Sequence, residues 1–282
     1  MKLLKGVGAT THVDSHGDRL EPAAIRRLAD KGNRIYLSFL LNHDPRVAPA
    51  GRLVSSTVEQ LEDGELSLNV EAEIFEDGDE IQWNSDGRRI SPELLVTNAQ
   101  IVYDATFDDR EAQAAIKEIA SILGMTTTRQ YKKAHEPLSV LMFCLGALSG
   151  SFLSALGQDV YAQVKKQLGV LLRPQERERV LVVQFQIEHV GRPIQIEIFV
   201  TNPTLSDLDE ILNRPVSAVQ KQLKPFTNQA EIVRVVAEYS KGKINPRFAI
   251  RADGVPFDSS GRIVGCGKEL SGGLSISFTV VD

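Results

Sequence analysis

His43 is the side chain in this 282-residue sequence that is best suited to acid–base chemistry. An apolar run from Ile35 to Leu41 predicts a strand, and Pro45 must end it, so His43 is expected at the strand's end. A histidine held rigidly at such a position, and open to a cleft, can act as a general base near neutral pH. The alternative interpretation is that His43 and Asp44 only form a polar turn between two strands.

The elements expected around His43 follow a characteristic order. They are a strand at 3–11, an Asp-x-x-Gly-Asp turn at 14–18, a helix from Pro22, the strand to His43, a Pro-x-Gly-Arg strand from 49 and a strand led by Gly64. This order of elements, over residues 1–75, resembles the N-terminal half of the tailed-phage prohead (capsid maturation) proteases. That family consists of serine peptidases related in fold to the herpesvirus assemblins.

The resemblance implies a cytoplasmic peptidase that cuts proteins within an assembling capsid, and by position it makes His43 the catalytic histidine. Such an enzyme also needs a serine hydroxyl whose proton the imidazole takes. In the family, a helix after the Gly-led strand leads into a Gly-Leu-Ser-Ile-Gly-Phe-like strand that carries this serine, but no such helix is expected after Phe75. The nearest candidate is Ser91, so we expect His43 and Ser91 to be the catalytic pair. Pro92 removes a backbone N–H that an oxyanion hole could use.

Ser275 and Ser277 are alternative nucleophiles, because Gly-Leu-Ser-Ile-Ser-Phe at 273–278 matches the family's serine strand more closely. This segment could complete the first domain only if residues from about 110 to 265 were an insertion. A simpler interpretation makes it the last strand of a C-terminal domain. The nucleophile therefore stays open, and no third catalytic group is assigned.

Four polar residues in the turn before the first helix could be read as a metal site: His12, Asp14, His16 and Asp18. Alternate residues on a strand share a face, but the Gly-Asp turn breaks that geometry, and the four could equally be structural. No Walker-type phosphate loop occurs. We therefore expect neither a metal nor a cofactor.

The composition limits the partners and the compartment. The 37 acidic and 32 basic residues give a net charge of −5, and many acidic residues lie between 59 and 80, so a phosphate backbone would be repelled there. No nucleic-acid partner is expected. Cys144 and Cys266 are far apart and have no metal-ligand spacing, which favours a reducing cytoplasm over a disulfide framework.

The chain is expected to be an α+β protein of two domains. Residues 1–125 form the β-rich, prohead-protease-like domain, 126–174 a linker and an apolar helical segment, and 175–282 a smaller α+β domain of unknown function. Within these, helices are expected from Asp108 to Gly124 and from Asp159. A hairpin is expected over 183–200, followed by helices on both sides of Pro215.

Residues 137–158 carry no charge and have two interpretations. One is a buried helix that docks the amphipathic helix after it. The other is a membrane span, for which the segment is long enough and in which Gly146-Ala-Leu-Ser-Gly150 has small-residue spacing. Serines and glycines dilute the run and favour burial.

These observations lead to a prohead-protease-like protein that acts as a serine endopeptidase on proteins, in a phage-related or phage-defence context. An inactive protein-binding adaptor and a membrane-associated effector are the alternatives. The expected partner is a protein, as substrate or as binding partner, and the oligomeric state stays open.

Overall fold

The chain folds into two compact units. The computed structural model describes residues 2–13, 19–39, 44, 46–76, 88, 99–104, 107, 109–130, 138–147, 158–173, 178–189, 191–227 and 231–265. Unit 1 consists of Met1–Leu94, Lys133–His135 and Ile250–Asp282, and unit 2 consists of Leu95–Lys132 and Glu136–Ala249. Unit 2 is therefore inserted into unit 1, which uses chain from both sides of the insertion. Helices and strands occur throughout, which confirms the α+β class.

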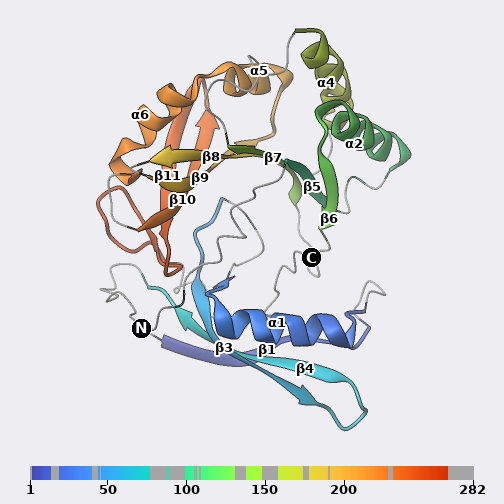
Figure 1. The fold of residues 1–282 in the computed structure, drawn as a ribbon, viewed down its shortest axis with the longest axis vertical. Coiled ribbons are helices and arrows are strands. Elements are labelled where there is room, and N and C mark those ends of the chain that lie inside the picture. Colours follow the sequence, from blue (N-terminus) through green and yellow to red (C-terminus); the bar gives the residue numbers. More distant parts are fainter. Residues whose placement is uncertain are drawn as a thin grey trace. The chain divides into compact units, whose positions relative to one another are not determined.

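Unit 1 contains an antiparallel sheet with one helix against one face (Figure 1). The strands are β1 (Lys2–Thr10), β2 (Ser38–Phe39), β3 (Gly51–Gln60) and β4 (Leu66–Ile74), in the order β1-β4-β3-β2. Helix α1 (Pro22–Arg34) begins with proline. Proline lacks a backbone N–H, but an N–H in the first turn of a helix has no partner within the helix, so no hydrogen bond is lost. Its buried Ile25 and Ala29 share a core with Leu53 and Leu68 of the sheet. These elements confirm the predicted succession of a strand, a helix and three further strands, while the turn expected at 14–18 and the residues just before His43 lie outside the described residues.

The β3–β4 hairpin follows from its turn residues. Gly64 has a φ of 85°, a conformation that glycine adopts without steric cost, and its N–H donates to the carbonyl of Leu61. The Asp63-Gly64 pair is therefore the local signal that sets the register of β3 against β4.

Unit 2 is built on a mixed sheet in which β11, β10, β9, β8, β7, β5 and β6 follow one another. Their bounds are β5 (Gln100–Asp104), β6 (Thr126–Gln130), β7 (Leu138–Ala147), β8 (Glu178–His189), β9 (Arg192–Thr201), β10 (Ile232–Ser240) and β11 (Lys243–Arg251). Three pairs of neighbours run parallel: β5 with β6, β7 with β8 and β9 with β10. Helices α2 (Arg110–Leu123), α4 (Gln158–Leu171), and α5 (Leu205–Asn213) with α6 (Val216–Thr227) connect these pairs in turn.

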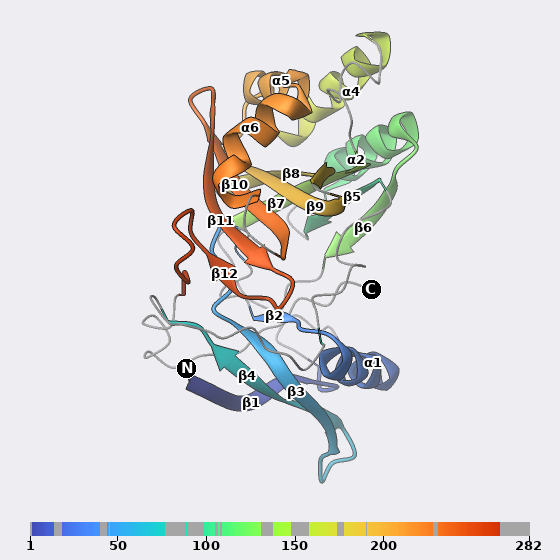
Figure 2. The ribbon, with the colours of Figure 1, turned by 60° about the vertical axis from the view of Figure 1, so that its left-hand side comes forward.

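The helices of unit 2 gather on one face of its sheet, as Figures 1 and 2 show. Tyr103 of β5 donates to Gln113 of α2, and Tyr239 of β10 donates to Glu210 of α5, so these tyrosines point toward the helices. Leu141, which pairs with Tyr103 and shares its face, is buried and apolar. This face forms the core of unit 2.

The helix expected over 137–158 is wrong for Leu138–Ala147, which form strand β7 between β5 and β8. An uncharged apolar run that is buried in a central strand gives the same sequence signal as a buried helix. Part of the expected linker, Thr126–Gln130, is strand β6. In the part of the chain that the structure describes, no helix is long and apolar enough to cross a membrane.

The division of the chain differs from the predicted domains. The predicted boundaries follow residues 125 and 174, whereas the two units change at 94/95, 132/133, 135/136 and 249/250. Periodicity cannot reveal this division, because it reports local structure and not which strands pair at long range. The expected helices near 108–124, from 159, and on both sides of Pro215 correspond to α2, α4, α5 and α6.

Candidate functional site

The catalytic residues expected from the sequence, His43 and Ser91, lie outside the described residues, as do the alternatives Ser275 and Ser277. Their described neighbours in the chain are known. Phe39 precedes His43 by four residues, Arg88 precedes Ser91 by three, and Gly265 precedes Ser275 by ten. The contacts of these neighbours show where each candidate segment begins.

Strands β2, β3 and β4 meet at one end of the sheet in unit 1. Phe39 pairs with Gly51, and Gly51 pairs with Ile74 on its other side. Gly51 is required there, because a Cβ at this position would overlap the backbone oxygen of Glu73. Strand β2, which leads toward His43, thus lies beside Gly51, where β3 comes close to the backbone of β4.

Arg52 occupies a buried ionic cluster at this end of the sheet. Its side chain is 1% exposed, and its Nε donates to Glu73 Oε2 at 2.5 Å. Its Nη1 donates to the backbone oxygen of Asp253 at 2.6 Å and lies 3.6 Å from the Asp253 carboxylate. The guanidinium also lies 4.3 Å from the ring centroid of Tyr36. Each charge in this cluster has an opposite partner, which burial of charge requires.

The turn that carries Asp253 is itself tightly organised. Arg251 donates to both carboxylate oxygens of Asp253, at 3.1 and 2.7 Å, and the N–H of Val255 donates to Oδ1. Gly254 has a φ of 87°, which favours glycine, and it faces the Cβ of Arg52. Strand β12 (Pro256–Phe257) follows. Arg52 is thus bonded to groups within unit 1, and its role there is to position chain segments.

Arg88 also reaches this end of the sheet. Its Nη1 donates to the carbonyl of Val54 at 2.6 Å, and its guanidinium carbon lies 4.7 Å from the centroid of Tyr36. The segment that leads to Ser91 therefore starts beside β3.

Gly265 lies against the end of β4. A Cβ at residue 265 would overlap the backbone oxygen of Phe75, so only glycine fits this approach without a shift. The segment that leads to Ser275 therefore starts beside the residue that follows β4.

Asp44, the neighbour of the expected base, is bound by an arginine. Arg46 donates its backbone N–H and its guanidinium to the Asp44 carboxylate, with Nη2 2.7 Å from Oδ2. This contact forms a compact turn and engages the carboxylate that could otherwise orient a histidine.

His12 pairs with the β3–β4 turn. Its Nε2 and Asp63 Oδ2 are hydrogen-bonded, 2.7 Å apart, and this bond lowers the pKa of Asp63 below its ordinary value of 3.8. The other residues of the expected turn cluster, Asp14, His16 and Asp18, lie outside the described residues. Among the residues that the structure describes, no group of three metal-ligating side chains comes together.

Cys144 is a buried thiol on the face of β7 that points away from the helices. Burial, and then the nearby Glu197 carboxylate, raise its pKa from 9.0 to about 12. Its Sγ donates to Gln184 Oε1 of β8. The thiol is therefore held in its neutral form, which is neither a nucleophile nor a metal ligand.

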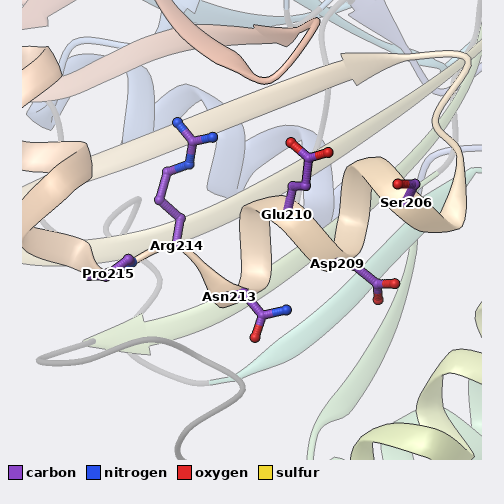
Figure 3. Close-up of a pocket in the computed structure, with 6 residues that line it drawn as sticks. All are labelled: Ser206, Asp209, Glu210, Asn213, Arg214 and Pro215. Carbon is purple, nitrogen blue, oxygen red and sulfur yellow. The ribbon is translucent and has the colours of Figure 1, made fainter.

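A pocket of about 430 Å³ lies on α5, at the surface of unit 2 (Figure 3). Its lining residues are Ser206, Asp209, Glu210, Asn213, Arg214 and Pro215. Figure 3 shows Glu210 and Arg214 pointing to one side of the helix and Asp209 to the other.

The charged groups of this pocket are bonded within unit 2. Tyr161 and Lys165 of α4 donate to Asp209, whose pKa is raised by desolvation. Tyr239 donates to Glu210, and burial followed by this contact raises the pKa of Tyr239 to about 12. Arg214 donates to the carbonyl of Gly242 at 2.9 Å. These contacts hold α5 to α4 and β10, and they engage all three charged side chains of the pocket.

Sequence reasoning missed the Arg52 cluster and the α5 pocket. A charged residue at an inward position of a strand is a signal for a buried ion pair, and Arg52 and Glu73 both carry it. The position of Asp253, 201 residues later, has no such local signal.

No protein-family model matches the chain, and neither the curated proteins nor the solved structures contain a match to it.

Proposed function

We propose that this protein is a serine endopeptidase in which His43 is the general base. The order of elements in unit 1 supports the proposal. Strand β1, helix α1, the strand before His43 and the β3–β4 hairpin follow one another as in the prohead-protease-like pattern of the sequence. That pattern makes His43 the catalytic histidine.

One observation carries the proposal. The chain returns to unit 1 at Ile250, and Gly265 lies against Phe75 at the end of β4. Unit 2, residues 95–132 and 136–249, interrupts unit 1 much as the expected insertion at about 110–265 would, which supports the Gly273–Phe278 segment as part of the first domain. Ser275, in the segment most similar to the family's serine strand, is therefore the preferred nucleophile.

Ser91 is the second candidate. Its segment starts at Arg88, beside β3 and Tyr36, which is close to the same end of the sheet. Pro92 counts against it, because the missing N–H cannot contribute to an oxyanion hole. Ser277 is two residues from Ser275, so the two would share a side of the strand that the sequence predicts for this segment.

In the proposed reaction, His43 takes the proton of the serine hydroxyl as the oxygen attacks a peptide carbonyl. The protonated imidazole then gives this proton to the leaving amine, and water releases the acyl group by the reverse steps. Asp44 is engaged by Arg46 and is not assigned as the orienting group.

The test is covalent labelling of the full chain with a fluorophosphonate, followed by peptide mapping. We expect one labelled serine, Ser275, and we expect loss of labelling in Ser275→Ala and His43→Ala. Ser91→Ala and Ser277→Ala discriminate between the candidates. Ser217→Ala, at an exposed position of α6, is the matched control that keeps full labelling. Labelling that survives His43→Ala, or no labelled serine at all, would exclude the proposal.

We further propose that unit 2 couples the peptidase to a protein partner in a phage-related or phage-defence setting. A phage capsid protease normally carries scaffold-like sequence, whereas this chain carries a second globular unit. Co-purification with the Ser275→Ala protein, compared with a sample whose unit 2 carries surface charge reversals, would test this role.

A further inference from the structure

Strand β1 combines an edge position with exposed apolar side chains. It lies at one end of the strand order in unit 1 and, among the described residues, pairs only with β4. In the described part of the chain three large apolar side chains are more than half exposed: Leu3 at 53%, Val7 at 51% and Val13 at 61%. Two of them lie on β1 and the third lies just beyond it. Edge strands of this kind are sites where another strand can be added.

Leu3, Lys5 and Val7 point to the same face of the sheet, because side chains alternate along a strand. Leu4, from the other set, packs against the core that α1 covers. Leu3, Lys5 and Val7 therefore lie on the face away from α1 and form an apolar–basic–apolar row. We call this row the β1 edge.

The other edge of the sheet differs. Strand β2 is only two residues long, Ser38 and Phe39, so it offers little backbone for pairing. Strand β1 has nine residues, with six in regular register from Lys2 to Val7 before an irregularity at Gly8. The β1 edge is thus long enough to pair with an added strand.

The charges at the β1 edge favour a partner of defined chemistry. Lys5 forms an ion pair with Glu71 of β4, yet its side chain is 71% exposed, so its ammonium can also contact a group on the outer side. An acidic side chain directly across from Lys5 would be stabilising, and a basic one would be destabilising.

A second copy of this chain fits less well. An antiparallel pair of β1 strands that sets Leu3 against Val7 must set Lys5 against Lys5 of the other copy. Like charges directly opposite each other destabilise a strand pair.

We propose that the β1 edge binds an extended segment of a partner protein that has an acidic residue between two apolar residues at alternate positions. The apolar side chains contact Leu3 and Val7, the carboxylate contacts Lys5, and the backbone adds a strand beside β1. This binding site is independent of the proposed peptidase site.

The test is fluorescence anisotropy of the full chain with two labelled nine-residue peptides. In one peptide the three central alternate positions are valine, glutamate and valine; in the other they are valine, lysine and valine. The remaining positions of both peptides are threonine. We expect the glutamate peptide to bind about tenfold more tightly, because the pair with Lys5 changes from attractive to repulsive. Lys5→Glu should reverse this preference, and His43→Ala should leave both affinities unchanged.

Two further variants separate the contributions. Leu3→Thr combined with Val7→Thr keeps β-forming residues but removes apolar contact, and it should weaken both peptides. Arg26→Glu, exposed on α1, changes the net charge as Lys5→Glu does and should alter neither affinity. Urea unfolding midpoints check that each variant is folded.

Three results would overturn the proposal. They are the absence of binding by the glutamate peptide, equal binding of the two peptides, and a preference that Lys5→Glu does not change. Dimerisation in analytical ultracentrifugation that the Leu3→Thr and Val7→Thr changes abolish would assign the edge to a second copy and would also overturn it.

Discussion

Arg52 and Asp253 are 201 positions apart in the sequence, yet Arg52 Nη1 donates to the backbone oxygen of Asp253 at 2.6 Å. Both residues belong to unit 1. The chain between them, from Leu95 to Ala249, belongs to unit 2 except for Lys133–His135. The contact therefore fixes the point at which the chain comes back to β3 after forming unit 2.

Replacing Arg52 with methionine should destabilise unit 1 by about 3–5 kcal/mol, because Glu73 and Asp253 would keep buried charges without their partner. Urea unfolding followed by circular dichroism measures the loss. Arg192→Met is the matched control. It removes an exposed pair with Glu231 and should cost about 0–1 kcal/mol. Equal effects of the two substitutions would contradict a buried ionic role for Arg52.

Replacing Gly265 with alanine should loosen the contact between the returning chain and the end of β4, at a cost of about 1–3 kcal/mol from overlap with the Phe75 carbonyl. Hydrogen–deuterium exchange should then speed up for amides near Ile74. Gly169→Ala in α4 is the contrasting control, since its Cβ meets only ordinary contact with Leu205 and alanine favours a helix. That variant should be more stable, by about 0.5–1 kcal/mol. Unchanged exchange at β4 would argue against the docking of residue 265.

The His12–Asp63 bond should give the protein an acid dependence. The pKa of Asp63 is lower in the folded protein than its ordinary 3.8, so the bond stabilises the fold above that value. The contribution is lost as the pH falls through the folded pKa. Carboxyl NMR titration should show the pKa of Asp63 rising toward 3.8 in His12→Ala but not in His189→Ala. An Asp63 that titrates at its ordinary value in the parent protein would rule out the bond.

Cys144 should resist alkylation in the folded protein. With its pKa raised to about 12, only about one thiol in a thousand is ionised at pH 9, and burial also blocks access. Iodoacetamide at pH 8 should modify Cys144 only after urea is added, as peptide mass spectrometry would show. Because the unfolded thiol ionises above about pH 9 and the folded one does not, stability should fall as the pH rises from there toward 12. Cys144→Ser should have a flatter profile, and rapid labelling of the native protein would contradict the buried, neutral thiol.

Local signals in the sequence predicted local structure well. Pro22, the Asp63-Gly64 turn and the alternation from Leu66 to Ile74 correspond to α1 and the β3–β4 hairpin. The cap at α5, where Thr204 and Asp207 exchange hydrogen bonds, fixes the start of the helix that was expected before Pro215.

Pairing between distant strands was not predictable in the same way. Leu138–Ala147 shows the same apolar, uncharged run whether it forms a helix or a strand buried on both faces, and only its neighbours β5 and β8 decide. The return of residue 253 to β3 rests on shape and charge complementarity across unit 1, which no period in the sequence encodes. The catalytic assignment of His43 remains a prediction from the sequence pattern.

The contact between Arg52 and Asp253 also sets an order for assembly on the ribosome. At about 5–20 residues per second, Asp253 is synthesised roughly 10–40 s after Arg52. During that interval Glu73 is the only one of its two acidic partners that exists, and nearly all of unit 2 is being synthesised. The ionic cluster around Arg52 can therefore be completed only after nearly all of unit 2 has been synthesised.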